Sequence, residues 1–166
     1  SGNGNHGQAF GGVAVIDSEI GKAFSFDGNN DYITTNLKLF NSTSSASPAS
    51  LSLWMMHDAT QPVASGDSII FGQAYYGGFG LSLHAGDLRA FFRNTAGSFV
   101  SSVFGGKTAW QHIVLVWGGQ PDSKVYVYLN GVLTRTITVT YADFEHELDS
   151  RPVRIGYPNP GGGSAF

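Results

Sequence analysis

Apolar and polar residues alternate along most of this chain, and turn residues interrupt the alternation at short intervals. Phe24 and Phe26 are separated by Ser25, and Leu51, Leu53 and Met55 occupy every second position further on. A period of two residues is typical of β-strands, in which successive side chains point to opposite faces, whereas helical periodicity is nearly absent. The pattern therefore predicts an all-β protein.

Turn-forming residues such as Gly, Asn and Asp separate the remaining alternating segments. Asp27–Asn30 predicts a hairpin that joins residues 24–26 to residues 32–33, and Asn130-Gly131 is the strongest hairpin signal in the chain. Further strands are expected at residues 68–73, 80–84, 88–93, 99–103, 110–117, 124–129, 132–140 and 153–156. About a dozen short strands with frequent turns predict two antiparallel sheets packed as a sandwich or jelly roll.

The strand runs also suggest which side chains are buried. Residues 51–56 are expected to be buried on at least one face, and we favour both faces. Trp54, Trp110 and Trp117 all lie in strand runs and are expected in the core. His112 is interpreted as a core or half-buried residue.

Composition narrows the class of protein. The 166 residues, expected to form one domain over residues 1–166, include 23 glycines and only 13% charged residues. A net charge of -3 without a basic run argues against nucleic acid as a partner. The absence of cysteine excludes disulfides and thiolate chemistry. No run of about 18 apolar residues is present, so membrane insertion is not expected.

Several ordered segments together resemble the laminin-G-like and pentraxin type of concanavalin A-like domain. Each segment is weak alone, but their order and spacing agree over essentially the whole chain. They are residues 1–7 (SGNGNHG), 21–33 (GKAFSFDGNNDYI), 50–54 (SLSLW), 110–116 (WQHIVLV), 125–132 (VYVYLNGV) and 154–156 (RIG). The resemblance implies a two-sheet antiparallel jelly roll.

The resemblance also implies a function class. Domains of this type are used most often for binding carbohydrate or protein in extracellular and surface proteins, although the same sandwich also occurs in glycosidases and structural units. The resemblance thus implies a non-catalytic recognition or adhesion module of a secreted or cell-surface protein. A calcium ion commonly lies at one rim, and the candidate ligands here are Asn3, Asn5, Asp27 and Asp31, since calcium prefers oxygen ligands. The alternative for these residues is ordinary turn chemistry.

The chain departs from the resemblance at both ends. The family has a strand before the SGNGNHG turn and another after a segment like residues 161–166, and the two lie side by side. Without them a sheet edge and part of the core stay uncovered, which favours strand addition. We therefore expect the missing strands to come from flanking parts of a longer polypeptide or from neighbouring copies; a chain that has been trimmed is the alternative.

Exposed aromatic residues are the expected ligand contacts, because sugar rings present apolar C–H faces. The candidates in turns and terminal loops are Tyr75, Tyr76, Phe79 and Tyr157. Two other interpretations stay open for them, namely cover for the edge of the core and contacts between subunits.

An acidic segment raises the question of catalysis. Glu145, Glu147 and Asp149 alternate, and paired carboxylates carry out glycoside hydrolysis, but their order differs from the glycosidase motifs of this sandwich class. A solvated loop is the favoured interpretation, so no enzyme is expected. The alternatives to a recognition module are a structural subunit of an extracellular filament, fibre or virion surface, and a polysaccharide hydrolase or lyase.

Overall fold

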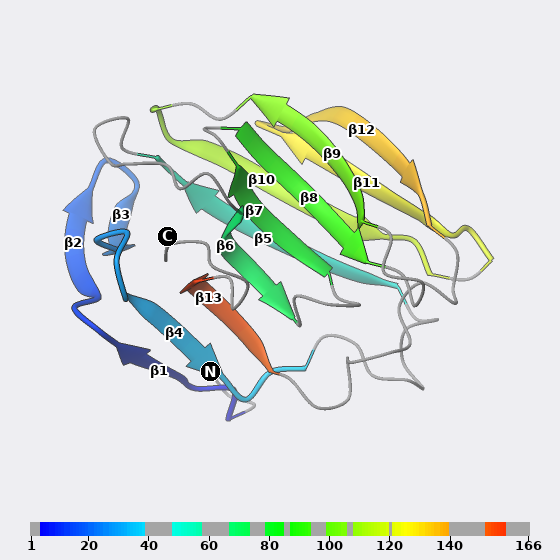
Figure 1. The fold of residues 1–166 in the computed structure, drawn as a ribbon. Coiled ribbons are helices and arrows are strands. Elements are labelled where there is room, and N and C mark those ends of the chain that lie inside the picture. Colours follow the sequence, from blue (N-terminus) through cyan, green and yellow to red (C-terminus); the bar gives the residue numbers. More distant parts are fainter. Residues whose placement is uncertain are drawn as a thin grey trace.

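In the residues that it describes, the computed structural model shows strands and no helix, and all ten strand pairings there are antiparallel. It describes residues 4–38, 48–57, 67–73, 79–84, 87–93, 99–105, 108–119, 121–139 and 152–158. Within these ranges thirteen strands form a seven-stranded sheet, a four-stranded sheet and a two-stranded ribbon (Figure 1). The predicted all-β sandwich is confirmed.

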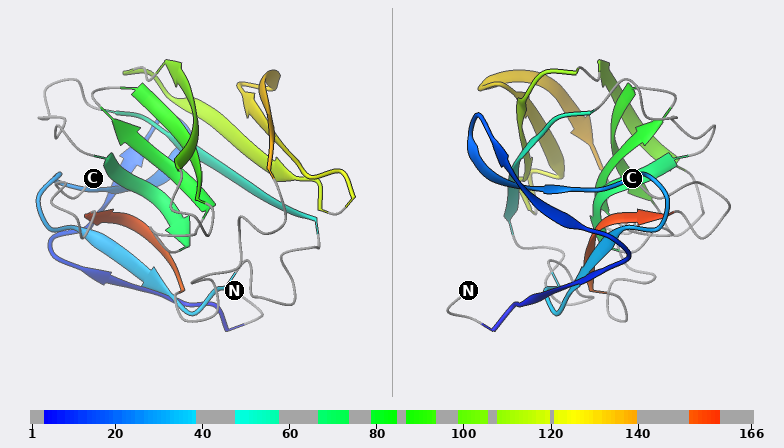
Figure 2. Two further views of the ribbon diagram at one scale, coloured as in Figure 1. Left: turned by 45° about the vertical axis from the view of Figure 1, so that its right-hand side comes forward. Right: turned by 90° about the vertical axis from the view of Figure 1, so that its left-hand side faces the viewer.

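Strand order defines the two layers. The seven-stranded sheet runs in the order β1 (Gly7–Phe10), β4 (Tyr32–Thr35), β13 (Val153–Pro158), β6 (Asp67–Gln73), β7 (Phe79–His84), β8 (Asp87–Arg93) and β9 (Phe99–Gly105). The four-stranded sheet runs in the order β12 (Val132–Thr138), β11 (Lys124–Leu129), β10 (Gln111–Trp117) and β5 (Ala49–Met55). Figure 2 shows the two layers from the side.

The core lies between these sheets. In β10 every second residue is buried, and Ile113, Leu115 and Trp117 point inward against residues such as Leu81 in β7 and Leu88 in β8. The intervening residues of β10 are only partly buried. Since inward positions alternate with outward ones, the four-stranded sheet has one face on the core and one outer face.

Two sequence-based expectations about pairing and burial are wrong. The predicted hairpin between residues 24–26 and 32–33 does not form, because β3 (Gly21–Ser25) pairs with β2 (Ala14–Ser18) and β4 pairs with β1 and β13. The strand β5 is not buried on both faces, since Ser50, Ser52 and Trp54 are exposed. Asp27–Asn30 does turn the chain, but long-range burial decides the strand partners.

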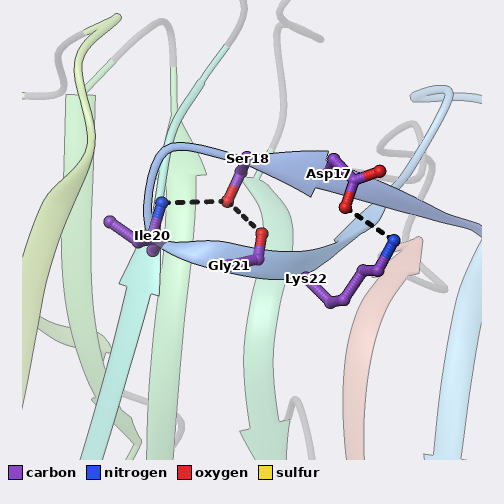
Figure 3. Close-up of polar contacts among 5 residues, drawn as sticks. All are labelled: Asp17, Ser18, Ile20, Gly21 and Lys22. Carbon is purple, nitrogen blue, oxygen red and sulfur yellow. Dashed lines mark hydrogen bonds and ion pairs between the residues drawn. The ribbon is translucent and has the colours of Figure 1, made fainter.

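The ribbon formed by β2 and β3 stands apart from both sheets. Its tip is fixed locally: the Ser18 hydroxyl donates to the Gly21 carbonyl at 2.6 Å and accepts from the Ile20 N–H at 3.3 Å (Figure 3). Asp17 and Lys22 form an exposed ion pair across the strands. Val15 and Phe24 lie opposite each other and are also exposed, so the ribbon presents an uncovered apolar pair.

Candidate ligand-binding face

The ligand contacts expected from the sequence do not form one site in the described structure. Tyr75 and Tyr76 lie outside the described residues, and Tyr157 is placed in β13. Phe79 begins β7 and is only 2% exposed, within the hydrophobic core. Its ring therefore fills the space between the sheets, and a surface role for Phe79 is corrected.

Asp31, one of the expected calcium ligands, is 1% exposed and receives two main-chain hydrogen bonds. Its Oδ1 accepts from the Gly12 N–H, and its Oδ2 accepts from the Asp27 N–H at 3.0 Å. Gly12 precedes β2 and Asp27 follows β3, so this carboxylate clamps the two ends of the ribbon at its base. A buried carboxylate needs such donors, because an unpaired charge is costly to bury.

The remaining expected metal ligands are more open. Asp27 is exposed, and its Oδ1 accepts from the Asn29 N–H at 2.9 Å, which is ordinary turn geometry. Asn5 is exposed and Asn3 lies outside the described residues. Across the described ranges, no three His, Asp or Glu side chains gather as a metal site. The calcium site stays a prediction.

The acidic segment at Glu145, Glu147 and Asp149 also lies outside the described residues. The part of the chain that the structure describes forms no helix long and apolar enough to cross a membrane.

A different surface, the outer face of the four-stranded sheet, presents an aromatic platform. Trp54 in β5 lies opposite His112 in β10, and the two rings stack with centroids 5.0 Å apart at 25°. Ser52 Oγ lies 2.8 Å from His112 Nε2. The imidazole is thus held by one hydrogen bond and one stacking contact, and it supports an indole that is 52% exposed.

The β11–β12 turn fixes the other side of His112. Asn130 and Gly131 both have positive φ, 50° and 81°, as a two-residue hairpin turn requires. The His112 N–H donates to Asn130 Oδ1 at 2.9 Å, and the Asn130 N–H donates to the His112 carbonyl at 2.8 Å. The predicted hairpin is confirmed, and it places the exposed Asn130 beside the platform.

Two tyrosines extend this surface along β11. Tyr126 and Tyr128 are partly buried and alternate with the inward Val125 and Val127. The Tyr126 hydroxyl donates to Asp122 Oδ2 at 2.9 Å, and this bond, with some desolvation and the nearby negative charge, raises the pKa of Tyr126. We call the whole surface the Trp54 face; it comprises Ser52, Trp54, His112, Tyr126, Tyr128 and Asn130.

Sequence reasoning assigned Trp54 to the core, and the structure corrects this. Trp54 shares its phase with Ser50 and Ser52 rather than with Leu51 and Leu53, so the alternation itself places it on the polar face. Of the other two tryptophans, Trp117 is fully buried as expected, and Trp110 is partly buried. His112 is half-buried, as expected.

The chain belongs to the concanavalin A-like lectin/glucanases superfamily, whose laminin G sequence model matches residues 27–166. No curated protein sequence matches the chain.

Solved structures of low sequence identity share the fold. The binding domain of Paraclostridial Mosquitocidal Protein 1 superposes with a TM-score of 0.69 at 14% identity, over 98% of this chain and 42% of that one. The botulinum neurotoxin serotype D binding domain superposes with a TM-score of 0.68 at 16% identity, over 92% of this chain and 38% of that one. The serotype D ligand binding domain in complex with N-acetylneuraminic acid has a TM-score of 0.64 at 13% identity, over 92% of this chain and 38% of that one. The chain thus spans about two fifths of these neighbours.

Proposed function

We propose that the chain is a non-catalytic recognition module of a secreted or cell-surface protein, and that it binds carbohydrate through the Trp54 face. The observation that carries this proposal is the exposed indole of Trp54 on the outer face of the four-stranded sheet, where the His112 ring stacks against it. Trp54 shares this face with the partly buried Tyr126 and Tyr128, and exposed apolar surface gathered on one face is typical of interaction sites.

The chemistry of the Trp54 face suits a sugar. A pyranose ring presents an apolar C–H face that packs on an aromatic ring, and its hydroxyls then need donors and acceptors at the margin. Around Trp54 these groups are the Ser52 hydroxyl, the Asn130 amide and the Tyr128 phenol. The low charge of this face favours a neutral glycan over an acidic or basic one.

The comparisons support recognition at a coarser level. The superfamily includes lectins, and the structural neighbours are binding domains, one of them in complex with N-acetylneuraminic acid. A protein ligand on the same face is the alternative, and the experiment below separates the two.

The test is binding of the full chain to a glycan array, followed by titration calorimetry with the best glycan. We expect Trp54→Ala to weaken binding by at least about 10-fold and Trp54→Phe to retain most of it, since aromatic contacts are worth about 1 kcal/mol or more. Val132→Ala, an exposed apolar change on β12, is the matched control and should bind normally. No glycan binding, or equal binding by Trp54→Ala, contradicts the proposal.

Calcium assistance is a separate part of the proposal. A site formed by Asp27, Asp31 and the Asn3–Asn5 turn would raise the melting temperature in millimolar calcium, because a ligand of the native state stabilises it. Magnesium at the same concentration is the control. An unchanged melting temperature, with unchanged glycan affinity, removes calcium from the proposal.

A second candidate function is a structural subunit of an extracellular assembly. The exposed Val15 and Phe24 on the free-standing ribbon favour it, because such an apolar pair gains by being covered. Phe24→Ser should then reduce self-association in analytical ultracentrifugation, whereas Lys22→Ser on the same face of the ribbon should not.

A further inference from the structure

The strand register arranges the side chains on the outer face of the four-stranded sheet in rows. Residues directly opposite each other on neighbouring antiparallel strands point to the same face, so the pairs that continue from Trp54 and its phase all lie on this face. The strands β5, β10 and β11 lie side by side (Figure 1). Across them the rows are, in order: Trp54, His112 and Asn130; Ser52, Val114 and Tyr128; and Ser50, Val116 and Tyr126.

Three of these residues form a straight apolar line across the sheet. Trp54 stands in the first row on β5, Val114 in the second row on β10 and Tyr126 in the third row on β11. Each step moves by one strand and one row, so the line is diagonal to the strands. We call these three residues the apolar diagonal. Trp54 is exposed and the other two are only partly buried, so the diagonal is accessible from solvent.

Hydrogen-bonding groups border the apolar diagonal on both sides. The exposed hydroxyls of Ser50 and Ser52 lie on one side, next to Val116. The Asn130 amide and the Tyr128 phenol lie on the other side. None of the residues in the three rows is Asp, Glu, Lys or Arg. The surface therefore matches a neutral ligand that is apolar along its middle and carries polar groups along both margins.

The apolar diagonal is longer than one sugar. Neighbouring strands lie about 4.8 Å apart and each residue advances about 3.3 Å, so the main chains of Trp54 and Tyr126, two strands and four residues apart, are separated by roughly 16 Å. One sugar ring packs on one aromatic ring. A ligand that contacts both Trp54 and Tyr126 must therefore contain several consecutive sugars.

Both ends of the apolar diagonal are held in place by other side chains. The His112 ring stacks on Trp54 with centroids 5.0 Å apart, and Asp122 Oδ2 accepts from the Tyr126 hydroxyl at 2.9 Å. Asp122 in turn lies 3.6 Å from Lys124 Nζ. Since the two aromatic rings are already positioned, a ligand loses little affinity by ordering them.

We infer that the apolar diagonal binds an internal stretch of a neutral polysaccharide with a flat, extended β-1,4-linked chain, rather than a terminal sugar. This inference rests on the proposed binding of carbohydrate by the Trp54 face. The sugar rings lie over Trp54, Val114 and Tyr126, and their hydroxyls project to the polar groups on both margins. Small ligands are usually enclosed in concave pockets, whereas a chain laid across the face of a sheet can continue beyond both ends of the diagonal.

The first test is the dependence of affinity on ligand length. The probes are β-1,4-linked oligomers of glucose, xylose and mannose, from disaccharides to hexasaccharides, titrated calorimetrically into the full chain. We expect the best hexasaccharide to bind at least about 10-fold more tightly than its disaccharide, because only the longer ligand reaches both aromatic rings. Maltohexaose, whose α-linked chain coils, is the control and should bind more weakly than that hexasaccharide.

The outcomes separate this inference from the proposed function. Equal affinity for the disaccharide and the hexasaccharide overturns the inference and leaves carbohydrate binding in place. Binding of array glycans by a chain that binds none of the β-1,4-linked oligomers does the same. A chain that binds no glycan at all removes the proposed function, and the inference with it.

The second test uses variants at the two ends of the apolar diagonal. Tyr126→Ala should weaken hexasaccharide binding by about 10-fold and change disaccharide binding little, whereas Trp54→Ala should weaken both. Tyr126→Phe is the matched control, since it keeps the ring and loses only the bond to Asp122, and it should bind the hexasaccharide normally. Circular dichroism checks that each variant folds. Unchanged hexasaccharide binding by Tyr126→Ala, or an equal loss for both ligands, contradicts the inference.

Discussion

The main chain of Gly11 passes against the side chain of Asp31, so closely that a Cβ at Gly11 would lie 2.5 Å from Oδ1. Gly11 also has φ = 74°, a region that only glycine adopts readily. The close approach lets the turn after β1 bring the Gly12 N–H to the Asp31 carboxylate. The base of the ribbon thus depends on a glycine and a buried acid acting together.

Replacing Gly11 tests this dependence. Gly11→Ala should lower the free energy of unfolding by about 3 kcal/mol, because it adds both a clash and an unfavourable φ. Gly4→Ala is the matched control: its φ of 70° is close to that of Gly11, but a Cβ there meets no atom within 4 Å. It should cost only about 1 kcal/mol. Equal losses in urea unfolding would mean that the close approach has no effect.

Removing the acid should have a comparable effect. Asp31→Ala leaves the Gly12 and Asp27 N–H groups without their acceptor, so we expect a loss of about 3 kcal/mol in thermal unfolding. Asp27→Ala, which removes one exposed contact to the Asn29 N–H, should cost about 1 kcal/mol. If the two variants unfold at the same temperature, the clamp does not stabilise the fold.

Truncation of Trp117 should destabilise the protein much more than truncation of Trp54. Trp117 is fully buried between the sheets, so Trp117→Ala should destabilise the protein by about 3–5 kcal/mol or prevent folding. Trp54→Ala should cost less than about 1 kcal/mol, since half of its side chain already faces water. Chemical denaturation of both variants checks this, and a large loss for Trp54→Ala would instead place that ring in the core.

Tyr126 provides a pH-dependent signal. Its hydrogen bond to Asp122 raises the pKa of the phenol above that of an unfolded tyrosine, about 10. The stabilisation is therefore complete below that unfolded value and is lost as the pH rises through the higher folded value. In an NMR titration Tyr126 should ionise at higher pH in the wild type than in Asp122→Asn. The same pKa in both would mean that Asp122 does not set it.

The strands from Asp67 onward could be predicted from the sequence to within a few residues. The reason is clearest in β10 and β11, where the alternation of residue types follows the alternation of burial directly. For example, Lys124–Leu129 was predicted with both ends correct. Local pattern and tertiary contact agree in this region, so one predicts the other.

Strands in the first third of the chain were predicted less accurately. Neither β1 nor β2 was predicted, and β3 was paired with the wrong strand, because the turn at Asp27–Asn30 is a local signal that does not specify partners. Ile33 is buried while Phe24 is exposed, a difference that depends on strands far away in sequence.

The candidate site was missed for a related reason. Residue type alone suggested that a tryptophan in a strand is buried, whereas the phase of Ser50 and Ser52 indicates the outer face for Trp54. The supporting contact with His112 spans 58 positions and requires the register of β5 with β10. No local pattern contains that information.

The Asp31 clamp has a mechanical consequence. Its two hydrogen bonds hold the chain just before β2 and just after β3, so both strands of the ribbon are anchored to the same carboxylate. Gly156 in β13 also lies against this point, since a Cβ there would be 3.2 Å from the Asp31 carbonyl oxygen. A movement of the ribbon is therefore coupled through Asp31 to β4, which follows it, and to β13, which packs against it.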